Sequence, residues 1–405
     1  MKVLMVTSSY PKFPGDVTAP FVESIARVVA ARGHAVDVVL PHHPDLRRGG
    51  SGDTPVRFFP YRYAPHPSWS RWGYAQSLQS DVKVRPEVWL LAPLAALALR
   101  REVGARLREE RYDAVHAHWL VPSAALVAGI VRAHQTPFVV SLHGSDVFLC
   151  ERFGAARTLA RRALAAAGAV TACSADLHRR ALVLGARSDR TRTVPYGVDI
   201  ERFAPQRADR TLRSRWDVPP GATMVVAVGR LVEKKGFTHL VEAARRVEEV
   251  HVIVAGEGDL RSALEKEAER AGGRVRFVGA LGRDQVARAL AAADVVAVPS
   301  IVDTAGNVDG LPNTVLEALA SGRAVVASHV AGIPEVVEHD VTGVLVPAGN
   351  VDALAGALQR LAREPATRER LGRAARERAV ARLGWEATAR SFEECYAQAA
   401  ALDAG

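Results

Sequence analysis

The 405-residue sequence predicts an α/β protein made of two doubly wound domains. Short β-branched runs alternate with longer Ala/Leu/Arg-rich segments of helical period, which is the pattern of parallel βα units. This alternation occurs twice, before and after the Pro/Gly-rich stretch from Asp217 to Gly221. The length also exceeds what one hydrophobic core usually serves, so two domains are expected.

The first series contains seven predicted strands. They are Val3–Thr7, Ala35–Leu40, Val56–Phe59, Ala114–Ala117, Phe138–Ser141, Val170–Ala172 and Thr193–Pro195. Helices are expected between them, and for one of them both ends are indicated, because Ser174 suits an N-cap and Gly185 a C′ stop. The apolar run at the N-terminus is too short for a signal peptide and is interpreted as the first strand.

The second series contains six predicted strands. They are Met224–Val228, His251–Ala255, Val275–Val278, Val295–Pro299, Ala324–Ser328 and Val344–Val346. Helical patterns from Ala366 to Ala401 have no strands between them, so the terminal helices can pack back across either domain. We expect a first domain at 1–197, a second at 198–380, and a terminal helix at 381–405 that returns to the first domain. The hinge should lie near Pro195 to Asp199, with the two domains facing a cleft.

Composition narrows the class of partner. The net charge of +9 favours anionic partners such as nucleotides, phospholipid surfaces or nucleic acid. Cys150, Cys173 and Cys395 have no metal-ligand spacing, which suits a reduced, metal-free cytoplasmic protein. The longest apolar run, Val88–Leu99, contains Pro93 and is shorter than the roughly 20 residues needed to span a bilayer. Contact with a membrane surface stays open.

Residues 41–85 differ from the rest of the first half. Arginines and aromatic side chains interleave between Arg57 and Tyr74, together with several prolines; they are Arg57, Phe58, Phe59, Tyr61, Arg62, Tyr63, Trp69, Arg71, Trp72 and Tyr74. One interpretation is an acceptor-binding loop or a membrane-facing patch. The other is an irregular excursion with a small aromatic cluster of its own.

A cationic turn follows the first strand of the second series. Gly229 and Arg230 come directly after the strand, and Lys234, Lys235 and Gly236 precede a predicted helix. Only six of the 53 Lys and Arg residues are lysine, so an adjacent pair stands out. The pattern suits a diphosphate site, although exposed lysine pairs after strands are also common. We expect Glu233 and Lys234 to be solvated neighbours of the site.

A pair of carboxylates lies after the strand that ends at Pro299. Asp309 precedes a helix predicted to start near Asn313, and Glu317 lies in that helix's first turns. Backbone N–H groups at a helix N-terminus can receive an anion, and carboxylates can accept hydrogen bonds from sugar hydroxyls. A helix cap with one solvated glutamate is the alternative.

Histidines follow two strands of the first series. His143 precedes Gly144 at a strand end, and Asp146 lies three residues further on. A lone histidine is more often structural, but the carboxyl end of a parallel strand favours a role in the predicted cleft. His116 and His118 end another strand and are expected to be wall residues.

These motifs, in this order, resemble the GT-B glycosyltransferases of the group 1, family 4 type over nearly the whole chain. The matching stretches are His143–Asp146, Val194–Asp199 with Phe203, Gly229–Arg230, Lys234–Gly236, Ala255–Gly258, Arg276–Gly279 and Glu317–Gly322. The resemblance implies two Rossmann-like domains and transfer of a sugar from a nucleotide-sugar donor to a sugar or lipid-linked acceptor. It implies retention of configuration and no metal or other cofactor. The arginine and aromatic segment from Arg57 to Tyr74, together with the basic charge, favours a lipid-linked or membrane-surface acceptor, as in exopolysaccharide, cell-envelope or glycolipid assembly at the inner face of the membrane.

The resemblance also implies roles for individual residues. Arg230 and Lys235 match the cations that neutralise the donor diphosphate, and His143 the residue near the transferred sugar. The other matches are donor-binding positions, namely Gly229, Asn313, Thr314, Glu317 at the ribose, Arg276 and Val278 at the nucleobase, and Asp146 as an orienting residue. Asp309 stands where the family usually has Glu at the transferred sugar. Gly15 is the one glycine of a first loop where many relatives have a pair.

Other classes of protein fit these residues less well. A dinucleotide-dependent oxidoreductase would use Gly256 and Gly258, but the third glycine of the fingerprint is absent and Arg276 lies where a ribose-binding acid is needed. A nucleic-acid binder would explain the charge but not the ordered motifs at strand ends. A sugar-nucleotide epimerase or a phosphorylase of the same fold is the nearest rival, and Lys266 is a poor candidate for the pyridoxal cofactor that a phosphorylase needs.

Overall fold

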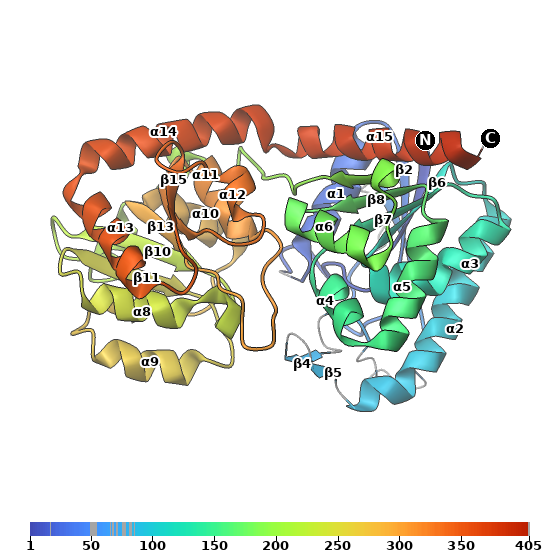
Figure 1. Ribbon diagram of the computed structural model, residues 1–405, viewed down its shortest axis with the longest axis horizontal. Coiled ribbons are helices and arrows are strands. Elements are labelled where there is room, and N and C mark those ends of the chain that lie inside the picture. Colours follow the sequence, from blue (N-terminus) through green and yellow to red (C-terminus); the bar gives the residue numbers. More distant parts are fainter. Residues whose placement is uncertain are drawn as a thin grey trace. The chain divides into compact units, whose positions relative to one another are not determined.

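The computed structural model describes residues 1–16, 18–48, 55–64, 66, 69, 72–74, 78–80, 83–84 and 86–403. The chain forms two compact units, each with its own sheet (Figure 1). Unit 1 comprises Met1–Pro195 and Trp385–Gly405, and unit 2 comprises Tyr196–Gly384. The divisions thus fall at 195/196 and 384/385, where the sequence predicted 197/198 and 380/381.

Unit 1 contains a seven-stranded parallel sheet in the order β3-β2-β1-β6-β7-β8-β9. The strands are β1 Lys2–Val6, β2 Ala35–Pro41, β3 Val56–Tyr61, β6 Ala114–His118, β7 Phe138–Leu142, β8 Ala169–Ala172 and β9 Thr191–Thr193. All seven predicted strands are confirmed, with ends shifted by at most two residues. A short antiparallel pair, β4 Leu78–Ser80 with β5 Lys83–Val84, was not predicted.

Seven α-helices of the described part of unit 1 accompany this sheet. They are α1 Pro20–Ala31, α2 Pro86–Glu109, α3 Ala125–Ala133, α4 Ser145–Arg152, α5 Gly154–Ala166, α6 Ala175–Leu184 and α15 Trp385–Asp403. Helix α6 has the predicted ends, since the Ser174 hydroxyl accepts the N–H of Leu177 and Gly185 is left-handed. Helix α15 packs on α1, and Arg32 binds both carboxylate oxygens of Glu393 at 2.7 and 2.9 Å. The terminal helix therefore completes the first unit.

Unit 2 contains a six-stranded parallel sheet in the order β12-β11-β10-β13-β14-β15. The strands are β10 Thr223–Val228, β11 Val250–Ala255, β12 Val275–Phe277, β13 Val295–Val298, β14 Ala324–Ser328 and β15 Gly343–Val346. The helices are α7 Thr211–Arg215, α8 Phe237–Arg245, α9 Arg261–Glu269, α10 Arg283–Ala292, α11 Asn313–Ala320, α12 Ile333–Val336, α13 Val351–Arg363 and α14 Pro365–Arg382. The six predicted strands are confirmed to within one residue. Two doubly wound sheets are the predicted fold class.

The arginine and aromatic segment packs largely into unit 1. Tyr61, Tyr63 and Tyr74 are 3–7% exposed, and the Tyr74 hydroxyl donates to the carbonyl oxygen of Pro41 at 2.6 Å. Arg57 binds both oxygens of Asp37 at 2.7 and 2.6 Å. Arg71 lies outside the described residues, whereas Trp69 is 57% exposed. This arrangement favours the interpretation as an aromatic cluster over a broad binding patch.

Candidate active site

Two loops meet at one edge of the unit 2 sheet, after β10 and after β13. These strands are neighbours, and β11 and β14 lie on their outer sides, so the strand order reverses between them. Ligands of doubly wound sheets bind outside the carboxyl ends of the strands at such a point. Gly229 to Gly236 follows β10, and Ser300 to Pro312 follows β13. Both predicted motifs of unit 2 therefore lie at the same strand ends.

Close backbone packing shapes the turn from Gly229 to Gly236. Gly256, just after β11, has φ +150°, and a Cβ on it would lie 1.9 Å from the carbonyl oxygen of Gly229. Gly236 has φ +67°, and its Cβ would lie 1.9 Å from the carbonyl oxygen of Pro299. Side chains at these positions would be both strained and obstructed. The glycines thus allow the turn to pack against the ends of β11 and β13.

One carboxylate pairs with both lysines of this turn. Lys235 Nζ lies 2.5 Å from Asp309 Oδ2, and Lys234 Nζ lies 3.2 Å from Asp309 Oδ1. The three side chains are only 12–17% exposed. Burial would by itself raise the pKa of Asp309, but the two ammonium charges hold that pKa well below its usual range. Asp309 is therefore an ionised counterion, and the three groups together carry one positive charge.

The expectation of a solvated neighbour is wrong for Lys234, whose side chain is 12% exposed and paired with Asp309, whereas Glu233 is exposed as expected. Besides the ion pair of its side chain, the carbonyl oxygen of Lys234 accepts the N–H of Ile301 at 2.9 Å. The Glu233 carboxylate accepts the N–H and the hydroxyl of Thr304, each at 3.0 Å. These bonds hold the cationic turn against the loop that follows β13, which is why Lys234 reaches Asp309.

Helix α11 brings a second carboxylate to the same strand ends. The helix begins at Asn313, as predicted, and the Thr314 hydroxyl donates to the carbonyl oxygen of Val228 at 3.1 Å. Glu317 is partly buried, and burial raises its pKa to about 7, against the lowering effect of Arg283 and Lys235. Glu317 thus changes charge near neutral pH, within the field of Lys235.

The remaining predicted donor residues of unit 2 lie on β10, β12 and their ends. The aliphatic part of the Lys235 side chain covers Gly229, since a Cβ on Gly229 would lie 3.4 Å from Lys235 Cε. The side chain of Arg230 is exposed. Arg276 pairs with Asp217 at 2.5 Å, in the segment before β10. The N–H of Val278 donates to the carbonyl oxygen of Val254 at 3.0 Å. The Arg276 guanidinium is thus engaged, while a contact of the neighbouring backbone with a nucleobase stays a prediction.

In unit 1, His143 directly follows β7, and Asp146 organises the turn around it. The Asp146 carboxylate accepts the N–H groups of Leu120, His143 and Gly144 at 2.7, 3.2 and 2.9 Å. Its side chain is 2% exposed, and burial raises the pKa of Asp146 against the lowering effect of these bonds. Asp146 thus joins the turn after β7 to the turn after β6 and orients His143. A direct contact of Asp146 with a sugar donor stays a prediction.

The His143 ring lies among other rings of unit 1. Its centroid is 4.8 Å from that of Phe21 and 4.9 Å from that of Trp119, and its Nε2 lies 3.2 Å from Nδ1 of His118. His116 and His118 are fully buried, so they are core residues rather than the expected walls. Gly15 is exposed in a turn in which the N–H of Asp16 donates to the carbonyl oxygen of Phe13 at 3.1 Å.

Sequence reasoning missed two cations of unit 2. The rarity of lysine in the chain marks Lys234 as much as Lys235, but only Lys235 matches the diphosphate-binding cation of the family. Arg283 opens α10 and acts electrostatically on Glu317, and no motif indicated it. A helix N-terminus is itself positive, so Arg283 adds to a field that favours anions.

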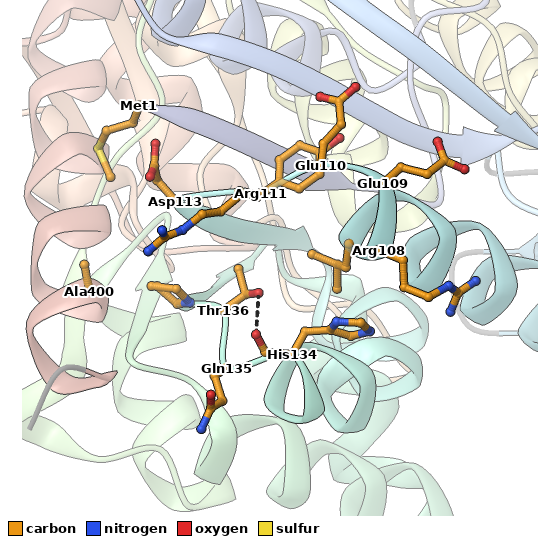
Figure 2. Close-up of a pocket in the computed structure, with 13 residues that line it drawn as sticks. Met1, Arg108, Glu109, Glu110, Arg111, Asp113, His134, Gln135, Thr136 and Ala400 are labelled. Atoms are coloured by element: carbon orange, nitrogen blue, oxygen red, sulfur yellow. Dashed lines mark hydrogen bonds between the residues drawn. The ribbon is translucent and has the colours of Figure 1, made fainter.

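A cavity of about 790 Å³ lies at the other end of the unit 1 sheet, where β1, β6 and β7 begin (Figure 2). Figure 2 shows side chains of both signs around it, among them Arg108, Glu109, Glu110, Arg111 and Asp113. It is separate from the predicted residues, which follow the strands. Among the described residues, no three His, Cys, Asp or Glu side chains are grouped as metal ligands.

Comparison with known proteins matches both halves of the chain. The family model of glycosyl transferases group 1 matches residues 209–378, and that of Glycosyltransferase Family 4 matches residues 19–202. A GDP-mannose-dependent alpha-(1-6)-phosphatidylinositol monomannoside mannosyltransferase of Mycobacterium tuberculosis is 30% identical over 396 residues, or 96% of each chain.

Solved structures share the fold at lower identity. Sucrose-phosphate synthase from Thermosynechococcus elongatus superposes with a TM-score of 0.79 at 21% identity, over 99% of this chain and 100% of that one. Anabaena HepE in complex with UDP-glucose gives a TM-score of 0.72 at 22% identity, over 97% and 98% of the two chains. These likenesses are to GT-B glycosyltransferases and bear on the fold of the chain.

Proposed function

Because the chain belongs to the group 1 glycosyltransferases, we propose that it transfers a sugar from a nucleoside-diphosphate donor to an acceptor hydroxyl with retention of configuration. The observation that carries the proposal is the pair of largely buried lysines held beside Asp309 at the strand ends of unit 2. The comparisons favour transfer over the epimerase and phosphorylase alternatives. In the reaction, the bond from the anomeric carbon to the diphosphate breaks, a bond to the acceptor oxygen forms, and the hydroxyl proton is released.

Lys235 and Arg230 are proposed to bind the donor diphosphate. Negative charge grows on the leaving nucleotide as the glycosidic bond breaks, and fixed cations stabilise that charge in a site that excludes water. The N-terminal residues Asn313 and Thr314 of α11 would offer backbone N–H groups to the phosphates. The N–H of Gly229 already donates to the carbonyl oxygen of Ala255 at 3.0 Å, so Gly229 would contribute through its lack of a side chain. We propose that these groups act without a divalent ion.

Glu317 and Asp309 are proposed to bind hydroxyl groups of the donor, Glu317 at the ribose and Asp309 at the transferred sugar. The Asp309 carboxylate pairs with Lys235 in the structure. A diphosphate carries more charge than one carboxylate, so it would displace Asp309 from Lys235. Lys234 would then keep Asp309 paired, and the oxygen released from Lys235 would be available to a sugar hydroxyl.

The other donor contacts follow the family resemblance. We propose that backbone groups from Arg276 to Val278 meet the nucleobase and that Gly15 allows its loop to approach the phosphates. His143, oriented by Asp146, would lie near the transferred sugar. These assignments rest on the matched motifs and on the position of each residue at a strand end.

We propose a lipid-linked acceptor and contact with the inner face of a membrane. The relative from Mycobacterium tuberculosis is named for a phosphatidylinositol monomannoside. Helix α2 supports the proposal, because its Leu90, Leu94 and Leu97 are 80, 49 and 66% exposed. None of the described helices is both long and apolar enough to cross a bilayer.

Binding of intact donors tests the proposed activity. A ligand at 100 times its dissociation constant stabilises the native state by about 2.7 kcal/mol, so thermal unfolding should report it. GDP-mannose, UDP-glucose and ADP-glucose would be compared on wild type and on Lys235→Ala. We expect one donor to raise the melting temperature of wild type and to have little effect on the variant. No response to any donor, together with no transfer to lipid extracts, would reject the proposal.

The stereochemical outcome needs its own measurement. The anomeric configuration of the product, read from the C1–H1 coupling in an NMR spectrum, should equal that of the donor. An inverted product would leave the transferase assignment standing and remove the retaining mechanism.

A further inference from the structure

The rings of His118 and His143 face each other edge to edge. Nδ1 of His118 lies 3.2 Å from Nε2 of His143, while the ring centroids are 5.4 Å apart and the planes differ by 17°. The difference between the two distances is close to twice the distance from an imidazole centroid to its nitrogen. The two nitrogens therefore point at each other in nearly one plane, which is the geometry of a hydrogen bond rather than of ring stacking.

The ring of His118 makes only this hydrogen bond among the described residues. Its side chain is fully buried, and its Nε2 has no hydrogen-bond partner in the described part of the chain. The neighbouring His116 is already engaged, with Nδ1 at 2.9 Å from the Tyr396 hydroxyl and Nε2 at 2.6 Å from the Ser141 hydroxyl. His118 can therefore satisfy one ring nitrogen, through His143.

Both rings are neutral at physiological pH. Burial lowers the pKa of His118 to about 3, and burial together with His118 lowers the pKa of His143 well below its usual value. Each ring then carries one proton, so one nitrogen of the facing pair donates and the other accepts.

The cost of an unpaired group decides which nitrogen donates. If His143 donated from Nε2, the proton of His118 would be on its buried Nε2, where no acceptor is described. If His118 donates from Nδ1, its Nε2 is a bare lone pair. Orphaned buried N–H groups are rarer than under-satisfied acceptors. The second arrangement is therefore favoured, and it places the proton of His143 on Nδ1.

We propose that His118 is a positioning residue that donates Nδ1–H to His143 Nε2 and so holds His143 in the tautomer protonated at Nδ1. Only the consequence of this proposal for sugar transfer rests on the proposed function. In this tautomer Nδ1 of His143 carries the proton and the lone pair of Nε2 is engaged by His118, so His143 is not the base that removes the acceptor proton. Asp146 fixes the backbone of the same turn, so ring and backbone of His143 are both held.

Nitrogen NMR of the full chain with ¹⁵N-labelled histidine tests the tautomer directly. Long-range ¹H–¹⁵N correlations should show His143 with a protonated Nδ1 and an unprotonated Nε2, and His118 likewise. A protonated Nε2 on His143 in the wild-type protein would overturn the proposal. This readout needs no turnover, so it stays decisive even if the proposed transfer activity fails.

Three variants test the effect on turnover. In His118→Asn the amide nitrogen takes the place of Nδ1 and keeps the donor, whereas His118→Gln places its amide where Nε2 was, and His118→Phe has no donor. We expect kcat to fall at least tenfold in the Gln and Phe variants and to recover largely in Asn. The His143 tautomer should follow the same order, with nucleotide affinity unchanged in all three. Equal loss in Asn and Phe, or no loss in either, would contradict the positioning role.

Discussion

Asp309 bridges two adjacent ammonium groups, with Oδ2 at 2.5 Å from Lys235 Nζ and Oδ1 at 3.2 Å from Lys234 Nζ. All three side chains are largely buried, so the pairs are screened little by solvent. Removing one partner of a buried pair leaves an uncompensated charge, at a cost of about 3–5 kcal/mol. The two lysines therefore need an anionic partner, and without one the strand ends of unit 2 are less stable.

Lys235→Ala should keep the fold and lose turnover. If the ammonium stabilises the departing diphosphate as a single electrostatic group does elsewhere, its loss costs about 3 kcal/mol, or roughly 100-fold in kcat. Steady-state kinetics with the donor found by thermal shift measures this effect. Lys266→Ala, an exposed lysine on α9, is the matched control and should retain activity. Wild-type rates from purified Lys235→Ala would remove Lys235 from the site.

Asp309→Asn should bind a nucleoside diphosphate more tightly than wild type while transferring sugar more slowly. The diphosphate then displaces no carboxylate, but the oxygen acceptor for the sugar hydroxyl is weakened. Calorimetric titration with GDP and UDP should show a several-fold lower Kd, and the unliganded variant should be less stable because two ammonium groups lose their counterion. Weaker nucleotide binding by Asp309→Asn would show that the carboxylate is not a competitor.

The strands of both sheets were predictable because each is a buried apolar run between polar or glycine-containing loops. Parallel strands covered on both faces keep an uninterrupted apolar pattern, as in Val225–Val228 and Val295–Val298. Ser174 and Gly185 were predictable for a local reason, since capping depends on backbone groups within a few residues.

The links within the site were not predictable in the same way. Lys234 and Asp309 are distant in sequence, and their contact depends on the backbone bond from Ile301 to Lys234 that holds the two loops together. The bond from His118 to His143 depends on neighbouring strands and on Asp146, which joins the turns after them. Strand ends indicated which residues would be near one another, but side-chain pairing required the structure.

Gly236→Ala should destabilise the protein and abolish nucleotide binding. A Cβ would lie 1.9 Å from the Pro299 carbonyl oxygen, so the cationic turn would have to move away from β13. Gly221→Ala is the matched control, because Gly221 also has a positive φ, of +81°, but nothing lies within 4 Å of its Cβ position. Denaturant unfolding should show a small loss of about 1 kcal/mol in the control, from backbone strain alone, and a larger loss in Gly236→Ala. Equal losses would mean that the close approach to Pro299 has no energetic role.

Donor affinity should depend on pH through Glu317. Its pKa is raised to about 7, mainly by burial, so the carboxylate is protonated below that pH and ionised above it. If the ionised form accepts the ribose hydroxyl bonds, KM for the donor should rise as pH falls from 8 to 6. His116, His118 and His143 do not titrate in this window, because burial lowers their pKa values.

Glu317→Gln supplies the control for that pH dependence, since its KM should be constant across the range. Stability gives a second check of sign. A carboxyl whose folded pKa lies above its unfolded value of 4.5 destabilises the native state progressively as pH rises from about 4.5 to 7. The Gln variant should therefore gain stability over wild type at pH 8, by at most about 3 kcal/mol, and little at pH 4.5. A wild-type KM independent of pH would contradict the proposed role.

Replacing the exposed leucines of α2 should abolish binding to anionic vesicles without changing the fold. Val88, Leu91, Ala95, Leu99 and Val103 are buried apolar positions of this helix, at spacings of three or four. The opposite side carries Leu90, Leu94 and Leu97, followed on the same side by exposed Arg101 four residues later and by exposed Arg108 two turns further on.

An apolar stripe that continues into arginines suits the boundary between acyl chains and anionic headgroups. The triple variant Leu90→Gln, Leu94→Gln, Leu97→Gln should lose sedimentation with vesicles that contain phosphatidylinositol. Val183→Gln, at an equally exposed valine on α6, should sediment as wild type does. Transfer to a water-soluble acceptor analogue should be unaffected in the triple variant, because α2 contributes none of the proposed donor contacts. Unchanged vesicle binding in that variant would move the membrane contact away from α2.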